Sequence, residues 1–267
     1  MAIESGLPSR YEIRILERKH EDWAKAIVSH SNMFYSPVWP VLYPQNLTKL
    51  CYEGMKELDY LIGHQIDSGY SIGVFDKEYQ FKRPESAATE GKLYWDYSDE
   101  KIDKDGLLEQ MDFPLVTVAM SYDGFNPLDM EKMMSLLAVL PAFGHIYGVL
   151  AMLDKRDGAS WQPKALGEVL MRNATSTRHD YEGKGLMRKL AQYLMRTSAD
   201  KGFRGIQIES LSDGVCKVWS NPPAPFKGEI VSEFHMQTFE QDDGNGQMVH
   251  PFHPADQRAT KIYVTLK

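Results

Sequence analysis

The chain has 267 residues, of which 43% are hydrophobic and 25% charged, so it can bury a sizeable core in one large domain or two small ones. Its net charge of −7 argues against general nucleic-acid binding. The two cysteines, Cys51 and Cys216, are too few for a disulfide framework. Because the N-terminus lacks a basic region followed by an apolar core, we expect no signal peptide and a cytoplasmic protein.

The first part of the chain predicts two strands and two helices, in the order strand, helix, helix, strand, at 11–16, 21–30, 46–65 and 70–75. Asn46 stands directly before the longer helix, where an Asn side chain can cap free backbone N–H groups. Ser68-Gly69 follows the helix and is expected to end it.

A polar and charged stretch follows at 77–112, with Tyr94, Trp95 and Tyr97 embedded in it. A stretch of this length inside a compact domain is usually functional or disordered, and the aromatic residues favour an ordered flap. Residues 113–121 then predict a strand of strong β character.

Residues 133–153 contain no Asp, Glu, Lys or Arg and are long enough to cross a bilayer. Pro141 and two glycines interrupt this stretch, so we favour buried helices broken near Pro141 over a membrane span, and expect no membrane partner. Asn126 is expected to cap the first helix, with Pro127 in its first turn. The pattern predicts a helical insertion at 127–155.

A strand, a glycine-containing loop, a helix and a second strand are predicted in the centre of the chain, at 166–175, 180–185, 186–199 and 203–209. Gly183 and Gly185 leave the backbone bare where the helix begins. The first turn of a helix offers free N–H groups and the positive end of the dipole. Lys184, Arg188 and Lys189 add positive charge. The pattern therefore predicts a phosphate-binding cradle between strand and helix.

Two common phosphate-binding motifs do not fit this loop. A P-loop requires Gly-Lys-Ser/Thr four residues after a first glycine, and that sequence is missing. The dinucleotide fingerprint requires a third glycine and an acidic residue about 20 positions on, and both are missing.

The order of elements around Asp180-Tyr181-Glu182-Gly183-Lys184-Gly185 resembles the signature region of the GNAT superfamily, the acyl-CoA-dependent N-acetyltransferases. In these enzymes, a loop with the sequence pattern Gln/Arg-x-x-Gly-x-Gly/Ala surrounds the pyrophosphate of coenzyme A. The sequence fits both glycines but places Asp180 where Gln or Arg is expected. The resemblance covers roughly 166–223, and 205–223 is similar to a fungal branch of the superfamily.

The resemblance implies an α/β (α+β) fold with a mixed, mostly antiparallel central sheet that opens midway, flanked by helices, in a single domain over 1–267. Towards the C-terminus the sequence predicts a short helix at 213–219 and strands at 229–239 and 261–266. A turn is expected between these strands at 242–246.

The resemblance further implies direct attack of a small-molecule primary amine on acetyl-CoA in a ternary complex, by a monomer or homodimer. Residues at two places would hold the coenzyme A cosubstrate. The backbone of Asn173, Ala174 and Thr175 would contact its pantetheine arm. The pyrophosphate would be bound by Asp180, Tyr181, Glu182, Gly183, Lys184, Gly185 and Leu186.

Two carboxylates are candidates for the proton acceptor. Glu168 stands early on the first central strand, where several GNAT members carry a catalytic carboxylate. In a regular strand it would face away from the side of Asn173, unless a bulge intervened, and a solvated strand-edge carboxylate is an equal interpretation. Glu209 ends the next strand and is the second candidate, alone or through a water molecule.

The proton donor for the thiolate is harder to place. GNAT members often supply a tyrosine seven residues after an Asn that contacts pantetheine, and those positions are Trp219 and Ser212 in this sequence. An indole N–H is too weakly acidic for this role. Ser212 or Cys216 are therefore the candidate donors, and Ser212 and Trp219 are candidate contacts of pantetheine.

His250 and His253 lie three residues apart but lack a cluster of other ligands, so we expect no metal site. His145 lies in an apolar stretch and is expected to be a core or pocket-lining residue. The alternative to an enzyme is a non-catalytic acyl-CoA-binding or interaction protein that keeps the GNAT fold, because of the missing tyrosine and Asp180.

Overall fold

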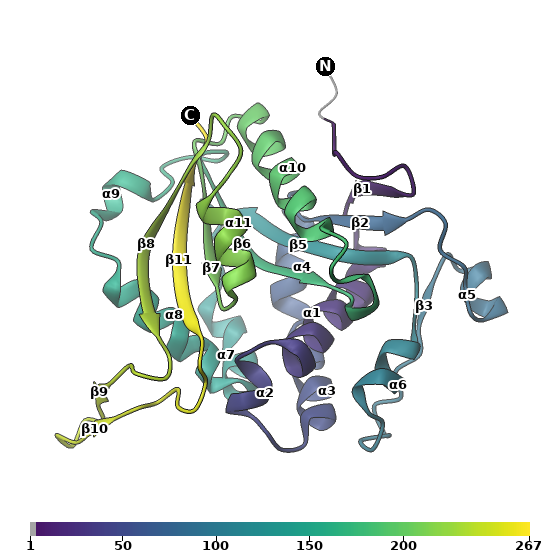
Figure 1. The fold of residues 1–267 in the computed structure, drawn as a ribbon, viewed down its shortest axis with the longest axis horizontal. Helices are drawn as coiled ribbons and strands as arrows, with labels where there is room; N and C mark the ends of the chain where they lie inside the picture. The colour runs from purple at the N-terminus through teal and green to yellow at the C-terminus, as the bar shows by residue number, and fades with distance from the viewer. Residues whose placement is uncertain (1–3) are drawn as a thin grey trace.

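The computed structural model describes residues 4–267, in which seven strands form one mixed sheet (Figure 1). All neighbouring strands are antiparallel except β6 and β7, which are parallel. The strand order is β1 (Tyr11–Ile15), β2 (Ile72–Asp76), β5 (Leu115–Asp123), β6 (Val169–Thr177), β7 (Gly205–Ser210), β11 (Arg258–Thr265) and β8 (Lys227–His235). The expected mostly antiparallel α/β fold is confirmed.

The sheet opens between β6 and β7. The two strands pair only from Val169–Gly205 to Arg172–Ile208, whereas β6 stays paired with β5 as far as Thr177. The register of β6 against β5 shifts between Arg172 and Ala174, which makes Asn173 the extra residue of a β-bulge. Beyond Arg172, the edge of β6 that faces β7 therefore has no strand partner.

Two helices cover one face of the sheet, α10 (Leu186–Asp200) and α11 (Asp213–Ser220). Leu186, Leu190 and Leu194 recur at helical spacing on α10 and are buried in the core beneath it. Burying one leucine side chain stabilises a fold by about 1.5–3 kcal/mol, so this face fixes the start of α10 firmly against the sheet.

A larger group of helices packs in a second core, mainly against the opposite face. It comprises η1 (Arg18–His20), α1 (Glu21–Tyr35), α2 (Trp39–Leu42), α3 (Leu47–Glu57), α4 (Asp59–Asp67), α7 (Met130–Val139) and α8 (Pro141–Leu153). The remaining short elements are α5 (Pro84–Ala88), β3 (Lys92–Leu93), α6 (Lys104–Glu109), β4 (Met111–Asp112), α9 (Gly158–Trp161), η2 (His179–Tyr181), β9 (Gln241–Asp242) and β10 (Met248–Val249). The turn expected at 242–246 lies between β9 and β10.

The single helix predicted at 46–65 is wrong, because α3 and α4 form two helices that meet at Leu58. Leu58 and Leu61 are both buried in the larger core, so the change of direction keeps the apolar side of each helix covered. Asn46 adopts a left-handed backbone (φ 54°) and its side chain makes no capping hydrogen bond.

The break expected near Pro141 is confirmed: α7 ends at Val139 and α8 begins at Pro141, whose missing N–H is tolerated in a first turn. The expected cap is wrong. Asp129, not Asn126, caps α7, and its carboxylate accepts a hydrogen bond from the N–H of Glu131 at 3.0 Å. Across residues 4–267 the longest apolar helices are too short or too polar to span a bilayer.

The segment 77–112 carries two short helices and a two-stranded ribbon. Trp95 is buried in the larger core and its Nε1–H donates to the carbonyl of Leu107 at 2.9 Å. This hydrogen bond joins the middle of the segment to α6, and both α6 and β3 pack against α1.

Candidate active site

The loop before α10 has the geometry of an anion cradle. Gly183 and Gly185 have left-handed backbones, with φ of 74° and 72°, and a Cβ at either position would point into open space. The first helical bond of α10 runs from the N–H of Lys189 to the carbonyl of Gly185. The N–H groups of the preceding residues in this turn are therefore free for a ligand.

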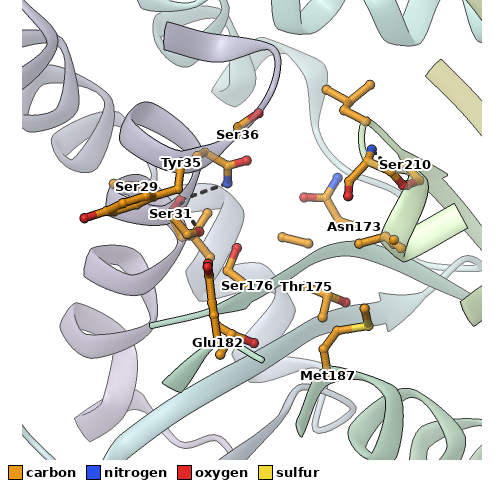
Figure 2. A pocket seen from close by; sticks show the side chains of 18 of the residues that line it. Ser29, Ser31, Tyr35, Ser36, Asn173, Thr175, Ser176, Glu182, Met187 and Ser210 are labelled. Carbon is orange, nitrogen blue, oxygen red and sulfur yellow. Dashed lines mark hydrogen bonds between the residues drawn. The ribbon is translucent and has the colours of Figure 1, made fainter. Parts of the chain in front are cut away.

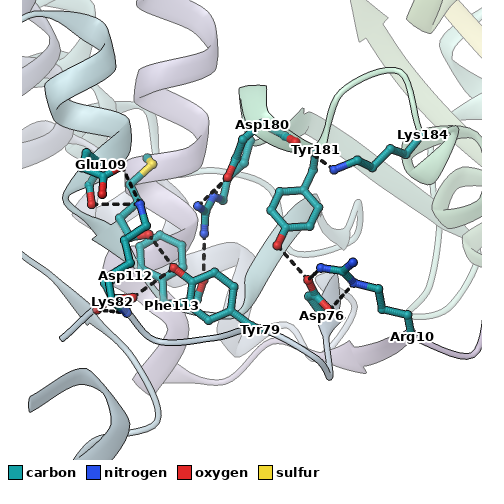
Figure 3. Close-up of polar contacts among 12 residues, drawn as sticks. Arg10, Asp76, Tyr79, Lys82, Glu109, Asp112, Phe113, Asp180, Tyr181 and Lys184 are labelled. Carbon is teal, nitrogen blue, oxygen red and sulfur yellow. Dashed lines mark hydrogen bonds and ion pairs between the residues drawn. The ribbon is translucent and has the colours of Figure 1, made fainter. Parts of the chain in front are cut away.

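Tyr181 ties this loop to the edge of the sheet (Figure 3). Its hydroxyl donates to Asp76 at 2.7 Å, and Arg10 donates to both oxygens of the same carboxylate at 2.8 and 2.6 Å. Burial would raise the pKa of Asp76, but the hydrogen bonds from Arg10 and Tyr181 outweigh it and lower this pKa. The ionised carboxylate thus holds the loop in place.

Lys184 and Asp180 have structural partners within the loop. The ammonium of Lys184 donates to the carbonyl of Asp180 at 2.8 Å and lies 4.1 Å from the centre of the Tyr181 ring. The carboxylate of Asp180 pairs with buried Arg178 at 2.9 Å, and Arg178 also donates to the carbonyl of Phe113. Asp180 does not line the cavity, so its charge is neutralised outside the cradle.

A cavity of about 1010 Å³ extends from the cradle through the opening between β6 and β7 into the helical side of the molecule. Figure 2 shows Ser29, Ser31, Tyr35 and Ser36 of the α1 region facing β6 across this space. One wall of the cavity is formed by Asn173, Thr175 and Ser176 of β6, and another by Ser210 of β7. Glu182 and Met187 line the end of the cavity at the cradle.

The structure brings the expected backbone segment of β6 to the cavity. Asn173, Ala174 and Thr175 all line it, at the bulge and on the unpaired edge of the strand. Tyr181, Glu182, Gly183, Lys184, Gly185 and Leu186 line it as well. The free edge of β6 offers backbone groups to an extended ligand, much as a neighbouring strand would use them.

Glu209 lies one residue beyond the last pair of β6 and β7 and lines the cavity. Burial raises the pKa of its carboxyl group, while the positive charges of Lys261 and Arg172 limit the rise. The amide of Gln207 donates to it over 3.4 Å. Glu209 is thus a carboxyl group at the deep end of the cavity with a pKa shifted towards neutrality.

Glu168 lies elsewhere, before β6 at the closed end of the sheet. It accepts a hydrogen bond from the N–H of Lys164 at 2.8 Å, faces Arg204 at 3.7 Å, and does not line the cavity. The bulge at Asn173 lies after it in the strand and does not turn it inward. The strand-edge interpretation of Glu168 therefore agrees with its position.

Of Ser212, Cys216 and Trp219, the residues near α11 that were expected as proton donors or pantetheine contacts, only Ser212 lines the cavity. Cys216 and Trp219 are buried in the smaller core beneath α11 and do not line it. Their positions do not support the roles expected of them, because both side chains point under the helix.

Tyr147 and Arg172 are two polar cavity residues among those that the sequence analysis missed. Tyr147 lies in the helical insertion, where no motif marks it, and burial raises the pKa of its hydroxyl. Arg172 stands beside Asn173 on the predicted strand, and a lone arginine in an apolar run was the available signal. The sequence analysis expected His145 to be a core or pocket-lining residue. In the structure its ring forms a hydrogen bond with Gln241 and packs on Phe252.

His250 contacts Glu240 and the carbonyl of Phe239. Within residues 4–267, His, Cys, Asp and Glu side chains form no group of three or more that could hold a metal ion.

No protein-family model matches this sequence, and neither does any curated protein. Solved structures do match it. The C-terminal condensation domain of Ebony in complex with beta-alanyl-dopamine has a TM-score of 0.59 at 17% identity, covering 95% of this chain and 97% of that one. Arylalkylamine N-acetyltransferase 2 from Aedes aegypti has a TM-score of 0.59 at 14% identity, covering 97% and 100%.

A polyamine N-acetyltransferase from Drosophila melanogaster, described as forming N-acetylagmatine, has a TM-score of 0.55 at 9% identity, covering 95% of this chain and 98% of that one. These likenesses concern the fold. The seven-stranded, mostly antiparallel sheet with flanking helices matches the fold of GNAT N-acetyltransferases.

Proposed function

We propose that this protein is an acyltransferase that moves an acetyl group from acetyl-CoA to the primary amine of a small molecule. The observation that carries the proposal is the left-handed Gly183 and Gly185 cradle at the start of α10, which leads into the cavity between β6 and β7. The cradle would hold the pyrophosphate, and the free edge of β6 would hold the pantetheine arm. Bound there, the thioester supplies an activated acyl carbonyl.

The chain's own groups have three tasks in this reaction. Glu209 accepts a proton from the ammonium, whose ordinary pKa is about 10, so that the nitrogen pair can form the new C–N bond. Backbone N–H groups on the free edge of β6 stabilise the negative charge on the carbonyl oxygen. When the C–S bond breaks, the sulfur keeps the electron pair and the nitrogen loses its second proton to solvent. The thiolate takes one proton from solvent, and Glu209 releases the first proton there, so the net reaction frees one proton.

The lining of the cavity favours an amine with an apolar body. Its helical half is built from apolar and aromatic side chains, among them Trp39, Leu61, Leu140 and Phe143. Glu182, the other acidic residue of the lining, lies at the cradle and contacts His179 at 3.1 Å. A polyamine would need a second buried carboxylate, so the proposal is a monoamine such as an arylalkylamine.

The proposal is tested by measuring the release of free thiol from acetyl-CoA. The amines compared are phenethylamine, hexylamine, agmatine and spermidine. We expect turnover with the two monoamines and at least about tenfold lower kcat/KM with the polycations, because one uncompensated buried charge costs more than 1.4 kcal/mol. Binding of acetyl-CoA without turnover on any amine would favour the non-catalytic acyl-CoA-binding alternative.

A further inference from the structure

Arg172 is a buried cation that lacks a hydrogen-bonding partner. Its side chain is 2% exposed, and within residues 4–267 its Nε and Nη2 atoms have no hydrogen-bond acceptor. The residue lines the cavity. Leaving such donors unpaired in a protein interior is costly, and proteins usually pair a buried charge or neutralise it. Burial accordingly lowers the pKa of this guanidinium to about 10.

The immediate neighbour of Arg172 cannot accept its hydrogen bonds. The guanidinium lies 5.1 Å from the centre of the Trp219 ring, and an indole supplies a π face and an N–H donor but no acceptor. The Nε1 atom of Trp219 is itself buried without a partner in the described chain. The two side chains therefore present only donors at this point.

The two carboxylates nearest the deep end of the cavity already have other cations beside them. Asp154 is shared by Arg156 at 2.6 Å and Lys261 at 3.0 Å. Lys261 stands opposite Glu209 in the sheet, and the Gln207 amide joins Arg156 to Glu209. These two carboxylates therefore match Arg156 and Lys261 in charge, and Arg172 is a further cation beyond that balance.

Arg172 and Glu209 lie on different faces of the sheet at the point where it opens. Arg172 pairs in register with Ile208, whose side chain belongs to the core beneath α10 and α11. Glu209 is the next residue and so points to the opposite face. The two charged groups therefore flank the end of the cavity rather than neutralise each other directly.

From these four observations we propose that Arg172 forms a subsite for a carboxylate carried by one of the two substrates of acyl transfer. The inference rests on the acyl transfer of the proposed function and adds a carboxylate to one of its two substrates. Arg172 lies one residue deeper along β6 than the bulge at Asn173, so it is reached by a group that extends beyond the reacting carbonyl. A guanidinium binds a carboxylate through two parallel hydrogen bonds, which would satisfy the unpaired donors. The carboxylate can come from the acyl group or from the amine.

Calorimetric titration without amine tests the acyl source. Malonyl-CoA and isovaleryl-CoA have acyl groups of the same shape, and only the first carries a carboxylate. We expect the parent protein to bind malonyl-CoA about tenfold to a hundredfold more tightly, the range for hydrogen bonds to a charged group. The preference should disappear in Arg172→Met and persist in part in Arg172→Lys.

The amine source is tested by titration in the presence of free coenzyme A. Phenylalanine is compared with phenethylamine, and 4-aminobutyrate with 4-methylpentylamine, since each pair differs by one carboxylate. If the protein prefers the carboxylate-bearing ligand only in this amine titration, the carboxylate belongs to the amine substrate. The control is Lys227→Met, which removes an exposed cation at the start of β8, outside the cavity, and should leave every ratio unchanged.

The affinities of the parent protein alone are enough to test the carboxylate subsite if Arg172→Met fails to fold. Tight binding of free coenzyme A with equal affinity inside every pair, or with a preference for the apolar member, would overturn the carboxylate subsite and leave the proposed function intact. Failure of free coenzyme A to bind the folded parent would overturn both. A preference that survives in Arg172→Met would also overturn the assignment to Arg172.

Discussion

At the scale of single residues, the proposed reaction depends on Glu209, a cavity-lining carboxyl group whose pKa is raised by burial. We expect Glu209→Gln to lower kcat by about a hundredfold to ten-thousandfold, the usual contribution of a general base, with little change in the affinity for acetyl-CoA. Thiol-release kinetics and calorimetry measure the two quantities. Glu168→Gln, outside the cavity, is the matched control and should retain activity.

The raised pKa of Glu209 also predicts how activity depends on pH. A base must be deprotonated to act, so kcat/KM should fall as the pH drops through the pKa of this carboxyl group, which lies above the ordinary value for glutamate. This fall of kcat/KM at low pH, the acidic limb of the pH profile, should be missing from the residual activity of Glu209→Gln. An unchanged acidic limb in that variant would show that another group titrates.

Asp154 illustrates a residue whose ionisation supports the fold. Hydrogen bonds from Arg156 and then Lys261 lower the pKa of its carboxyl group against the effect of burial. Because the folded pKa is depressed, this stabilisation is present above the unfolded value, about 3.9, and is lost as the pH falls through the folded pKa. Asp154→Asn should lower the free energy of unfolding by about 3–5 kcal/mol at pH 7. Denaturant titration at pH 7 and pH 3 checks the size and the sign.

At the scale of elements, the cradle is held by Tyr181 of η2, Asp76 of β2 and Arg10, the residue before β1. Tyr181→Phe removes one donor from a buried carboxylate, at a cost of about 1–3 kcal/mol, and frees the loop before α10. We expect a lower Tm and weaker binding of coenzyme A from this one change. Tyr11→Phe, a tyrosine at the edge of the same group, is the comparison variant. Unaltered affinity in Tyr181→Phe would mean that the glycines alone fix the cradle.

Local patterns in the sequence were enough to predict the elements that position the cradle. The apolar spacing of α10 and the glycines at 183 and 185 predict the helix start, and the left-handed angles agree with that prediction. Pro141 likewise marks the break between α7 and α8. The division at Leu58 was not predictable in this way, because it follows from tertiary packing of both helices on one core.

The candidate site was less predictable than the fold, since its members meet only in three dimensions. The backbone of 173–175 was proposed through the GNAT resemblance, and Glu209 from its place at the end of the next predicted strand. Tyr147 comes from α8, far away in the chain, and nothing in its local pattern marks it as a cavity residue. The direction of Trp219 likewise depends on how α11 packs against the smaller core.

At the scale of the whole molecule, the two cores support different ends of the cavity. The core beneath α10 and α11 fixes the cradle, and the helices of the larger core form the apolar half of the cavity. The opening between β6 and β7 connects the two halves. In our proposal, coenzyme A enters from the first side and the amine from the second, so both meet beside Glu209.

The most direct test of this account is calorimetric titration of the parent and of Gly185→Glu with acetyl-CoA. The variant places a side chain and a negative charge in the space at the start of α10. Gly69→Glu is the matched control, because Gly69 has a similar left-handed backbone (φ 75°), open surroundings and a position outside the cavity. We predict binding by the parent and by Gly69→Glu, and a loss of at least about a hundredfold in Gly185→Glu. Absence of binding by the folded parent, or equal binding by Gly185→Glu, would contradict the account.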